Sequence, residues 1–342
     1  MASPTTALIT GVGGQDGVYL ARELVGLGYR VVGTLQPGPD SARRAALPYL
    51  DGVLVRELDL RDAQGFEQLL EEFRPDEIYN LAGFSSVGAS WDNREHVAEV
   101  NGMAVLRMLD ALLRQRDRHG SCGRFYQAST SEMFGLSKEQ PQTEDTPHYP
   151  RSPYAVAKSF AHYLTINYRE SYDLYCCSGI LYNHESPLRG RQFVTRKITR
   201  AAAEIACGVR DRVSLGNLSV ERDWGAASDY VSAMRLLLQH DEPGDYIIAT
   251  GESHSLEELL EVAFESAGLG DPWPYVDQDP ALIRPTDVGG LIGDASKARR
   301  QLGWEPTVRF EQVVEEMVQV DIRRVKSGVE ESADYLVATS SL

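Results

Sequence analysis

Cysteine, positive charge and long apolar runs are all scarce in this chain, and each shortage argues against a class of protein. The 342 residues include only four cysteines and no CxxC pair, which argues against a disulfide-stapled secreted scaffold. We expect reduced, mostly buried thiols in a cytoplasmic protein. Histidine and cysteine nowhere recur at the spacing of metal ligands, so no metal is expected. The apolar runs are too short to span a bilayer, and we expect no signal peptide before the first strand.

Positive charge is outnumbered by negative charge. The chain has 34 lysines and arginines against 50 aspartates and glutamates, a formal net charge of −16. Such an acidic surface argues against binding to nucleic acid or to an anionic membrane, but it leaves room for a local basic pocket that holds a phosphorylated substrate. The 42% hydrophobic and 25% charged residues are typical of a soluble globular protein, and the length suffices for one large domain or two lobes.

The first half of the chain alternates between short apolar strands and segments with helical periodicity. This β-α-β-α order predicts an α/β fold, a Rossmann-like doubly wound parallel sheet with helices on both faces. Strands are expected at residues 7–10, 29–35, 53–58, 77–81, 125–128 and 176–182, and helices at 18–27, 63–73, 95–116 and 154–172.

The second half of the chain is less regular. Helices are expected at 193–208, 256–268, 295–302 and 310–325, with a strand at 246–249, a loop at 186–192 and little periodicity across 270–290. We therefore expect a dinucleotide-binding domain of residues 1–182 plus about 220–250. A smaller C-terminal α/β substrate-binding lobe is expected to comprise about 183–219 and 251–330, followed by a flexible tail at 331–342.

A glycine-rich turn follows the first strand, in the sequence TGVGGQDGVYL. It places Gly11, Gly14 and Gly17 between a strand and a helix. A pyrophosphate must approach backbone N–H groups at a helix N-terminus, and a Cβ there would block it. The pattern alone is also compatible with a turn that binds nothing, but its position at the start of a βαβ unit predicts dinucleotide binding.

Two later strand ends fit a bound dinucleotide. Asp59 and Leu60 end the third strand, where an aspartate can bond the adenine amino group. Leu81 and Ala82 follow the fourth strand and leave room for the cofactor to lie across the sheet edge. Taken singly, each pair is equally well explained as a turn at the end of a strand.

The segment SPYAVAK contains Tyr154 and Lys158, which are four residues apart and therefore on one face of a helix. Free tyrosine has a pKa of about 10, too high for a base at neutral pH. A neighbouring ammonium and a cationic nicotinamide both favour the phenolate, so we expect a lowered pKa for Tyr154. The tyrosine would then accept a proton from a substrate hydroxyl while hydride leaves the same carbon. An exposed tyrosine and lysine on a helix is the alternative.

Thr130 and Glu132 follow another predicted strand, in the sequence QASTSEMFG. A carboxylate just beyond a core strand is an odd choice if packing is all that matters. Spacing alone leaves two interpretations of Glu132 open, a catalytic group or a loop residue that is solvated or salt-bridged.

These residues carry a family resemblance. The chain resembles the extended short-chain dehydrogenases/reductases and, more narrowly, the GDP-mannose 4,6-dehydratase family. The glycine turn and the YxxxK pair belong to the whole superfamily, whereas QASTSE, NHESP, FVTRKI and the LGNL…RDWG segment are specific to the dehydratases. The matching stretches run over nearly the whole chain. They include ALITGVGGQDGVYLA, PDEIYNLA, TEDTPHYPRSPYAVAK and LIGDASKARRQLGWEP.

The resemblance implies a nucleotide-sugar 4,6-dehydratase that converts GDP-mannose to GDP-4-keto-6-deoxymannose with NADP or NAD. Tyr154 would take the proton of the C4 hydroxyl as hydride passes to the nicotinamide, and Thr130 would bond the C4 oxygen. Glu132 would remove the C5 proton, which the new ketone acidifies, and would protonate the departing C6 hydroxyl. Hydride would then return to C6.

By position, the resemblance also implies the ligand contacts. The cofactor would contact Gly11, Gly14, Gln15, Asp16, Gly17, Asp59, Leu60, Leu81, Ala82, Tyr154, Lys158, His184 and Arg189. The nucleotide sugar would contact Ser85, Glu132, Asn183, Val194, Lys197, Arg222 and Arg284. Arg222 and Arg284 suit a diphosphate because a guanidinium fork matches its oxygens. A surface ion pair is the alternative for each arginine, and a hydrogen-bonded core residue is the alternative for His184.

The chain departs from the family near the cofactor. Gln36 and Pro37 occupy the positions of a usual arginine pair, which serves the 2′-phosphate and, in tetrameric members, a neighbouring subunit. The family therefore implies NADP while these residues leave NAD open, and we expect a homodimer from the superfamily's usual helix interface. Arg43 and Arg44 come later, and we interpret them as a solvated helix start.

The chain also departs from the family beside the sugar. Phe84 and Ser86 replace the usual glutamine and histidine. Two alternatives are therefore a dehydratase for a different nucleotide sugar and a same-fold 4-epimerase or reductase. A cofactor-binding redox sensor is a third, but such a protein would be expected to lose the Tyr154–Lys158 pair.

Overall fold

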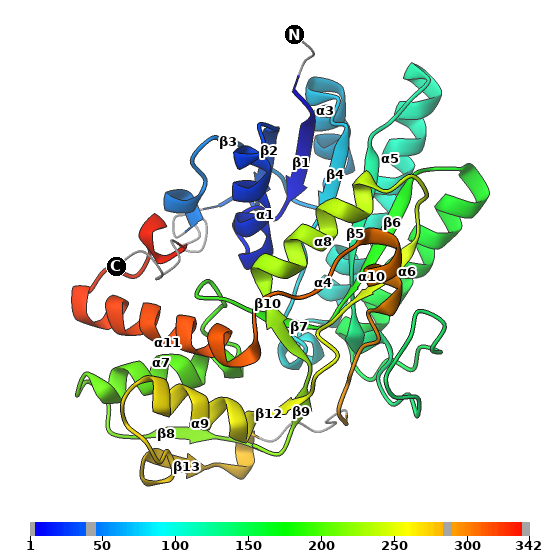
Figure 1. Ribbon diagram of the computed structural model, residues 1–342. Coiled ribbons are helices and arrows are strands. Elements are labelled where there is room, and N and C mark those ends of the chain that lie inside the picture. The colour runs from blue at the N-terminus through cyan, green and yellow to red at the C-terminus, as the bar shows by residue number, and fades with distance from the viewer. Residues whose placement is uncertain (1–3, 39–45, 283–288, 337–342) are drawn as a thin grey trace.

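The core of the protein is a seven-stranded parallel sheet in the order β11-β6-β5-β4-β1-β2-β3 (Figure 1). This computed structural model describes residues 4–38, 46–282 and 289–336. The strands are β1 Thr6–Thr10, β2 Arg30–Leu35, β3 Val53–Glu57, β4 Glu77–Asn80, β5 Arg124–Thr130, β6 Cys176–Leu181 and β11 Asp245–Ile248. All seven were predicted within a few residues, because strands buried on both faces are short, nearly continuous apolar runs. The predicted doubly wound parallel sheet is confirmed.

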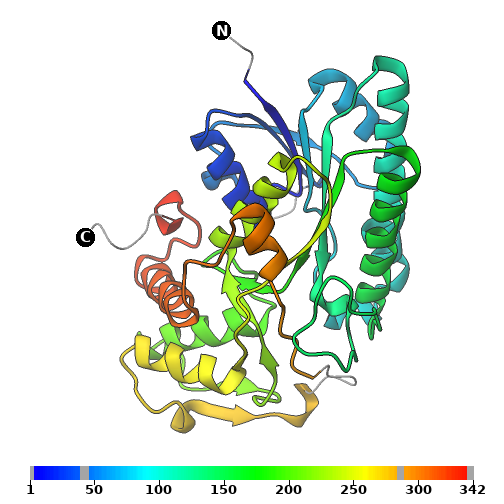
Figure 2. The same cartoon turned by 45° about the vertical axis from the view of Figure 1, so that its right-hand side comes forward.

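Helices cover both faces of the sheet, and each face has its own buried cluster. Alternate residues of β1 divide between the clusters, Ala7 and Ile9 on one side and Leu8 on the other. Helices α1 Gln15–Gly26 and α8 Ala227–Gln239 pack together on the first face. Helices α3 Ala63–Phe73, α5 Ala104–His119 and α6 Pro153–Tyr172 cover the second, where α5 and α6 run side by side (Figure 2).

The helix predicted at 95–116 is present but interrupted. It consists of α4 Arg94–Ala98, a π-helical turn (η3, Glu99–Met103) and α5. Sequence periodicity does not reveal such a turn, because one extra residue per turn barely shifts the apolar stripe. Short 3₁₀ segments lie in the loops between these elements. Three come before α6, namely η1 Leu47–Tyr49, η2 Gly88–Trp91 and η4 Ser131–Met133, and η5 Trp273–Tyr275 comes after it.

The smaller lobe lies below the sheet in Figure 1 and has its own apolar cluster. Its helices are α7 Val194–Ala206, α9 Leu256–Ser266 and α11 Phe310–Ser327. Its strands pair as β8 Val213–Leu215 with β13 Val276–Gln278, and β9 Glu221–Arg222 with β12 His254–Ser255. A further pair, β7 Asn183–Glu185 with β10 Trp224–Ala226, connects the lobe to the sheet. None of these short strands was predicted, because two or three residues carry no detectable period.

Two boundaries of the predicted domains need correction. Helix α10 (Ser296–Leu302), expected in the lobe, packs against β11 and α8, and its Ala298 belongs to the same buried cluster as Ile247. The predicted flexible tail is packed up to residue 336, since Tyr335 lies buried within η7 (Ala333–Leu336) and its hydroxyl donates to Val329 O at 2.6 Å. A last 3₁₀ segment, η6 Pro280–Leu282, lies within the stretch predicted to be irregular.

Candidate active site

The glycine turn after β1 is shaped by close backbone contacts. Gly11 has φ +72°, and a Cβ there would lie 2.7 Å from Ala82 Cα. A Cβ on Gly17 would lie 2.4 Å from Gly11 O, so α1 starts directly against the turn. Gly14 is the N-cap of α1 and supplies no side-chain cap. The first N–H groups of α1 are therefore available to an anion, which fits the pyrophosphate of a dinucleotide.

Gln15 and Asp16 tie the first turn of α1 to β7. The amide of Gln15 donates to His184 O at 3.0 Å, and the hydroxyl of Ser186 donates to Gln15 Oε1 at 2.8 Å. Both oxygens of Asp16 lie 3.0 Å from His184 Nε2. Burial alone would raise the pKa of Asp16, but the His184 imidazole outweighs it and the pKa is lowered. The same contact raises the pKa of His184 against its own burial. Asp16 and His184, both predicted to contact the cofactor, thus form a hydrogen-bonded pair that braces the turn.

A chain of buried hydrogen bonds crosses three strand ends and finishes at Lys158. Thr10 Oγ1 donates to Asn80 Oδ1 at 2.8 Å, and Asn80 Nδ2 donates to Gln127 Oε1 at 2.9 Å. Gln127 Nε2 and Lys158 Nζ then both donate to Ala128 O, each at 2.9 Å. The ammonium of Lys158 is thereby held at the carboxyl end of the sheet.

Tyr154, Thr130 and Glu132 come together at the end of β5. Ser152 caps α6 by accepting from Ala155 N at 3.1 Å, which sets Tyr154 in the first turn of the helix. The Tyr154 and Thr130 hydroxyls are hydrogen-bonded, and the Glu132 carboxylate is close enough to raise the pKa of Tyr154. The predicted catalytic threonine, glutamate and tyrosine therefore share one site.

The chain by itself raises the pKa of Tyr154, and the lowering that a cationic nicotinamide would bring stays a prediction. Burial raises the pKa of Tyr154 to about 12, and the hydrogen bond from Thr130 offsets this only in part. Burial also lowers the pKa of Lys158 to about 8. The ammonium lies 5.9 Å from the centre of the Tyr154 ring. Desolvation of the buried phenol outweighs the hydrogen bond from Thr130 and the charge of Arg189, the two contributions that lower the pKa.

Asn101 was missed by the sequence analysis. It lies buried in the π-helical turn, where its Oδ1 accepts from Phe84 N at 2.7 Å and its Nδ2 donates to Phe84 O at 2.8 Å. These bonds fix the loop after β4 beside Lys158, whose Nζ would be 3.9 Å from a Cβ on Gly83. The sequence signal that could have revealed Asn101 is a polar residue on the apolar face of the helix predicted at 95–116.

The Asp59 carboxylate forms an ion pair with Arg61. Both of its carboxylate oxygens accept from Arg61, with Nη2 at 2.6 Å from Oδ2. This hydrogen bonding lowers the pKa of Asp59 to about 2. A contact from Asp59 to adenine therefore stays a prediction, as do those from Leu60, Leu81 and Ala82.

The predicted sugar-side residues surround the junction of sheet and lobe. Asn183 begins β7, Val194 begins α7, and Arg222 is buried in β9. Lys197 follows in the first turn of α7, and no carboxylate pairs with it in the part of the chain that the structure describes. Ser85 is exposed after β4, whereas Arg284 lies outside the described residues.

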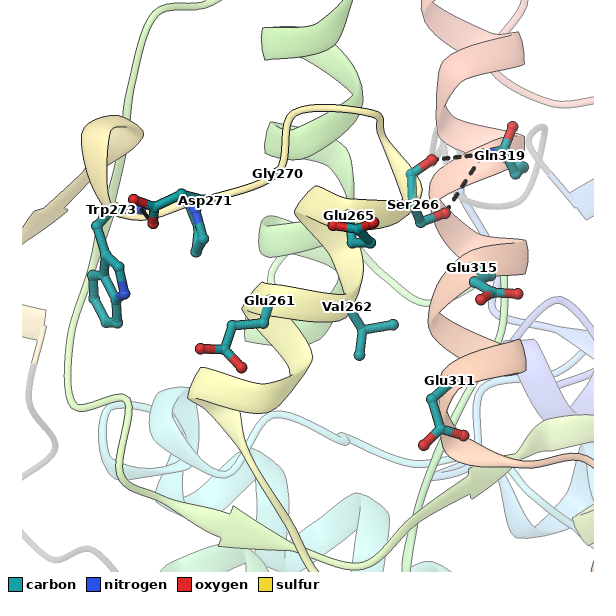
Figure 3. Close-up of a pocket in the computed structure, with 11 residues that line it drawn as sticks. Glu261, Val262, Glu265, Ser266, Gly270, Asp271, Trp273, Glu311, Glu315 and Gln319 are labelled. Atoms are coloured by element: carbon teal, nitrogen blue, oxygen red, sulfur yellow. Dashed lines mark hydrogen bonds between the residues drawn. The ribbon is translucent and has the colours of Figure 1, made fainter.

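A groove of about 780 Å³ lies elsewhere, between α9, α11 and residues 270–273 (Figure 3). Glu261 and Glu265 line it from α9, Glu311 and Glu315 from α11, and Gln319 closes one end. None of the predicted site residues borders it. Its carboxylates disfavour a diphosphate, and we interpret it as a solvated acidic face of the lobe.

Within residues 4–38, 46–282 and 289–336, no group of three or more histidine, cysteine or acidic side chains could hold a metal ion. Over the same ranges, no helix is long and apolar enough to cross a membrane. The four cysteines are all free.

Comparison with known proteins matches the chain to a family model and to curated relatives. Residues 8–317 match the family model described as GDP-mannose 4,6 dehydratase. GDP-mannose 4,6 dehydratase 1 of Arabidopsis thaliana is 46% identical, covering 94% of this chain and 90% of that protein. The Homo sapiens GDP-mannose 4,6 dehydratase is 42% identical, covering 94% and 92%. A Thermus thermophilus UDP-glucose 4-epimerase structure with NAD is 28% identical, with a TM-score of 0.80 over 93% of this chain and 99% of that one.

Proposed function

This chain belongs to the GDP-mannose 4,6-dehydratase family, and we propose that it removes water from GDP-mannose to form GDP-4-keto-6-deoxymannose. It is a nucleotide-sugar dehydratase that works with a nicotinamide dinucleotide. The observation that carries the proposal is the grouping of Tyr154, Thr130 and Glu132, with a carboxylate beside the proton acceptor. The glycine turn before α1 and Lys158 would hold a nicotinamide dinucleotide there, which would supply the reversible hydride transfer between the sugar carbons C4 and C6.

Tyr154 is proposed to take the proton of the C4 hydroxyl. Its raised pKa of about 12 means that the phenolate forms only where positive charge adjoins it. Lys158, with a pKa of about 8, is still largely protonated at neutral pH and is held by Ala128 O. Thr130 is proposed to donate to the C4 oxygen and so to stabilise the ketone.

Glu132 is proposed to act at C5 and C6. The 4-ketone acidifies the C5 proton. The Glu132 carboxylate can remove it, since Glu132 lies in the 3₁₀ segment that Thr130 caps and its N–H donates to Thr130 Oγ1 at 3.3 Å. The same carboxyl can then give that proton to the C6 hydroxyl, which leaves as water. Once hydride has returned to C6, the resulting enolate takes a proton from solvent at C5, which completes the 4-keto-6-deoxy sugar. An epimerase, which only exchanges hydride at C4, needs no carboxylate at this place.

Three finer assignments rest on family membership. NADP is the proposed cofactor, although Gln36 and Pro37 after β2 offer no guanidinium to a 2′-phosphate. The proposed location is the cytoplasm. A homodimer is proposed, supported by an exposed apolar stripe of Val156, Phe160 and Tyr163 along α6.

The test replaces Glu132 by glutamine, which keeps the shape of the side chain and removes the base. We expect loss of water from GDP-mannose to fall by at least about a hundredfold. Reduction of the nicotinamide, followed by its near-ultraviolet absorbance, should remain detectable because Tyr154 is intact. Mass spectrometry in deuterated water should show deuterium entering C5 with the natural enzyme and not with the variant.

The matched control is Asp145→Asn, which removes one negative charge from an exposed position in the segment between Glu132 and α6. It should dehydrate the sugar at nearly the natural rate. Undiminished water loss in Glu132→Gln would remove the role given to Glu132. Inversion at C4 without water loss by the natural enzyme would instead indicate a 4-epimerase, and dehydration of another nucleotide sugar alone would overturn only the substrate.

A further inference from the structure

A buried carboxylate on α11 lies at the centre of an unusual cluster of arginines. Asp321 is fully buried and accepts from Arg196 at 2.8 Å (Nε to Oδ2) and 2.7 Å (Nη2 to Oδ1). It also accepts from Thr199 at 3.1 Å and from Arg324 at 3.2 Å. Burying such charges is costly, and apolar side chains of the same volume often stabilise a core as well. Stability alone therefore does not explain this cluster.

Arg196 also binds the loop that follows β7. Its Nη1 donates to Pro187 O at 2.8 Å and to Arg189 O at 2.9 Å. The guanidinium thus joins α11 on one side to the main chain of residues 186–189 on the other, and we call this segment the strap. One planar group makes all these bonds because its N–H groups point outward in a fixed fork.

The strap is attached to the nucleotide-binding turn at its other edge. Ser186 Oγ donates to Gln15 Oε1 at 2.8 Å, in the first turn of α1. The strap also carries Arg189, whose Nε lies 3.1 Å from Glu185 Oε2 and whose guanidinium carbon lies 3.7 Å from the centre of the Phe193 ring. Arg189 is thereby held both by its main chain and by its side chain.

We propose that Asp321 and Arg196 are positioning residues for the cofactor, holding the strap and its Arg189 against the nucleotide-binding turn. The inference rests on the proposed function, because it takes Arg189 to contact the bound dinucleotide. A dehydratase must keep its reduced cofactor until hydride has returned to C6. A firmly held strap serves this need. Helices α7 and α11 pack against each other in the lobe (Figure 1), and the bonds from Arg196 and Ser186 fix the strap between these helices and the first turn of α1.

The test compares Arg196→Lys with Arg200→Lys. Lysine keeps the positive charge beside Asp321, but a single ammonium cannot reach a carboxylate and two carbonyls in the fork geometry. Arg200 lies one turn further along α7, pairs with Glu204 at 2.8 Å and Glu330 at 3.0 Å, and makes no bond to the strap. Its lysine variant therefore controls for the loss of a guanidinium from the same cluster.

The first measurement needs no ligand. Amide hydrogen exchange across residues 186–193 of the full chain should be faster in Arg196→Lys than in the natural protein, and unchanged in Arg200→Lys. The second is the affinity for reduced nicotinamide dinucleotide, followed by its fluorescence. We expect Kd to rise about tenfold or more in Arg196→Lys, mainly through faster dissociation, and to change less than about twofold in Arg200→Lys.

Turnover gives a third measurement. If the reduced cofactor leaves early, hydride taken from C4 is not returned, and the sugar is released after water loss as an unsaturated 4-ketone. One free reduced dinucleotide should then accumulate for each such sugar in Arg196→Lys and not in Arg200→Lys. Should Arg196→Lys fail to fold, Asp321→Asn, which keeps an acceptor oxygen, should show the same direction.

Equal exchange rates and equal Kd values in the two lysine variants would overturn the proposal. Failure of the natural protein to dehydrate any nucleotide sugar would instead remove the proposed function. The exchange and affinity measurements would still decide whether Asp321 and Arg196 hold the strap, since neither depends on the sugar.

Discussion

His148 is a titratable side chain held without a partner inside an aromatic cluster. Its Nδ1 is buried and unpaired among the described residues, and its ring lies 5.4 Å from Phe134, 5.3 Å from His162 and 5.2 Å from Tyr163. Burial, helped by His162 and opposed by Asp245, lowers the pKa of His148 to about 4. Because burial keeps this imidazole neutral, His148 lowers the free energy of unfolding in acid.

The sign follows from proton linkage. The unfolded chain, with an ordinary histidine pKa of about 6.5, binds more protons than the folded chain between about pH 4 and 6.5, so stability rises with pH across that window. His148→Phe keeps the ring and removes the titration. We expect it to raise the free energy of unfolding by about 1–2 kcal/mol at pH 5 and to flatten the pH dependence. Urea unfolding between pH 4.5 and 7.5 measures both, and an unchanged slope would contradict this account.

Tyr154 and Glu132 show how far single residues can be assigned from sequence. The role of Tyr154 follows from the YxxxK spacing, whereas that of Glu132 was assigned only through the family resemblance. Their closeness was expected because a strand end and the helix that follows it meet at one sheet edge. The pKa of Tyr154 does not follow from the motifs. It depends on how completely the surrounding chain removes water from the phenol.

At the scale of elements, the two glycines of α1 carry different constraints. A Cβ on Gly17 would meet Gly11 O at 2.4 Å, a contact with main chain that can be relieved only by shifting the turn. A Cβ on Gly26, in the last turn of the same helix, would meet nothing within 4 Å. Gly17 is therefore required by the packing of the turn, whereas Gly26 only costs helix propensity.

We predict opposite effects of alanine at these two positions. Gly17→Ala should lower the free energy of unfolding by about 2 kcal/mol or more, because the turn must shift. Gly26→Ala should raise it by about 0.5–1 kcal/mol, through a less flexible unfolded chain and a better helix former. Denaturation without cofactor separates this effect from ligand binding. Equal stabilities of the two variants would contradict the assigned packing.

The elements themselves divide into those that periodicity reveals and those that it does not. Long helices and buried strands were predicted because many residues repeat one pattern. The π-helical turn at Glu99–Met103 and the paired strands β7 and β10 were not. Both depend on residues that are distant in the sequence. The π-helical turn is held by the hydrogen bonds between Asn101 and the main chain of Phe84, and β7 and β10 each form only by pairing with the other.

At the scale of the whole molecule, α6 presents an apolar stripe to solvent. Val156, Phe160 and Tyr163 are 55%, 43% and 54% exposed, and their spacing places them on one side of the helix. Phe160 also packs within 3.0 Å of the position a Cβ would take on Gly102, so it is anchored against η3. Such a stripe on a long helix is suited to a twofold interface with a second copy.

We predict that Phe160→Glu gives a monomer. A buried glutamate pair across a twofold axis would be costly, so light scattering after size exclusion should show half the natural mass. Val209→Glu places the same charge on an exposed apolar residue of the lobe and should leave the mass unchanged. Circular dichroism checks that both variants fold. A natural protein that already runs as a monomer would contradict the dimer.

The sequence by itself determined the parts of this protein that depend on neighbours along the chain. The glycine turn, the Tyr154–Lys158 spacing and the order of strands and helices follow from backbone sterics and from local periodicity. The tertiary structure decided the raised pKa of Tyr154, the packing of α10 on the sheet and the bond from Arg196 to Asp321, which is 125 residues away. These depend on which distant groups share a dry environment, and only the folded chain brings those groups together.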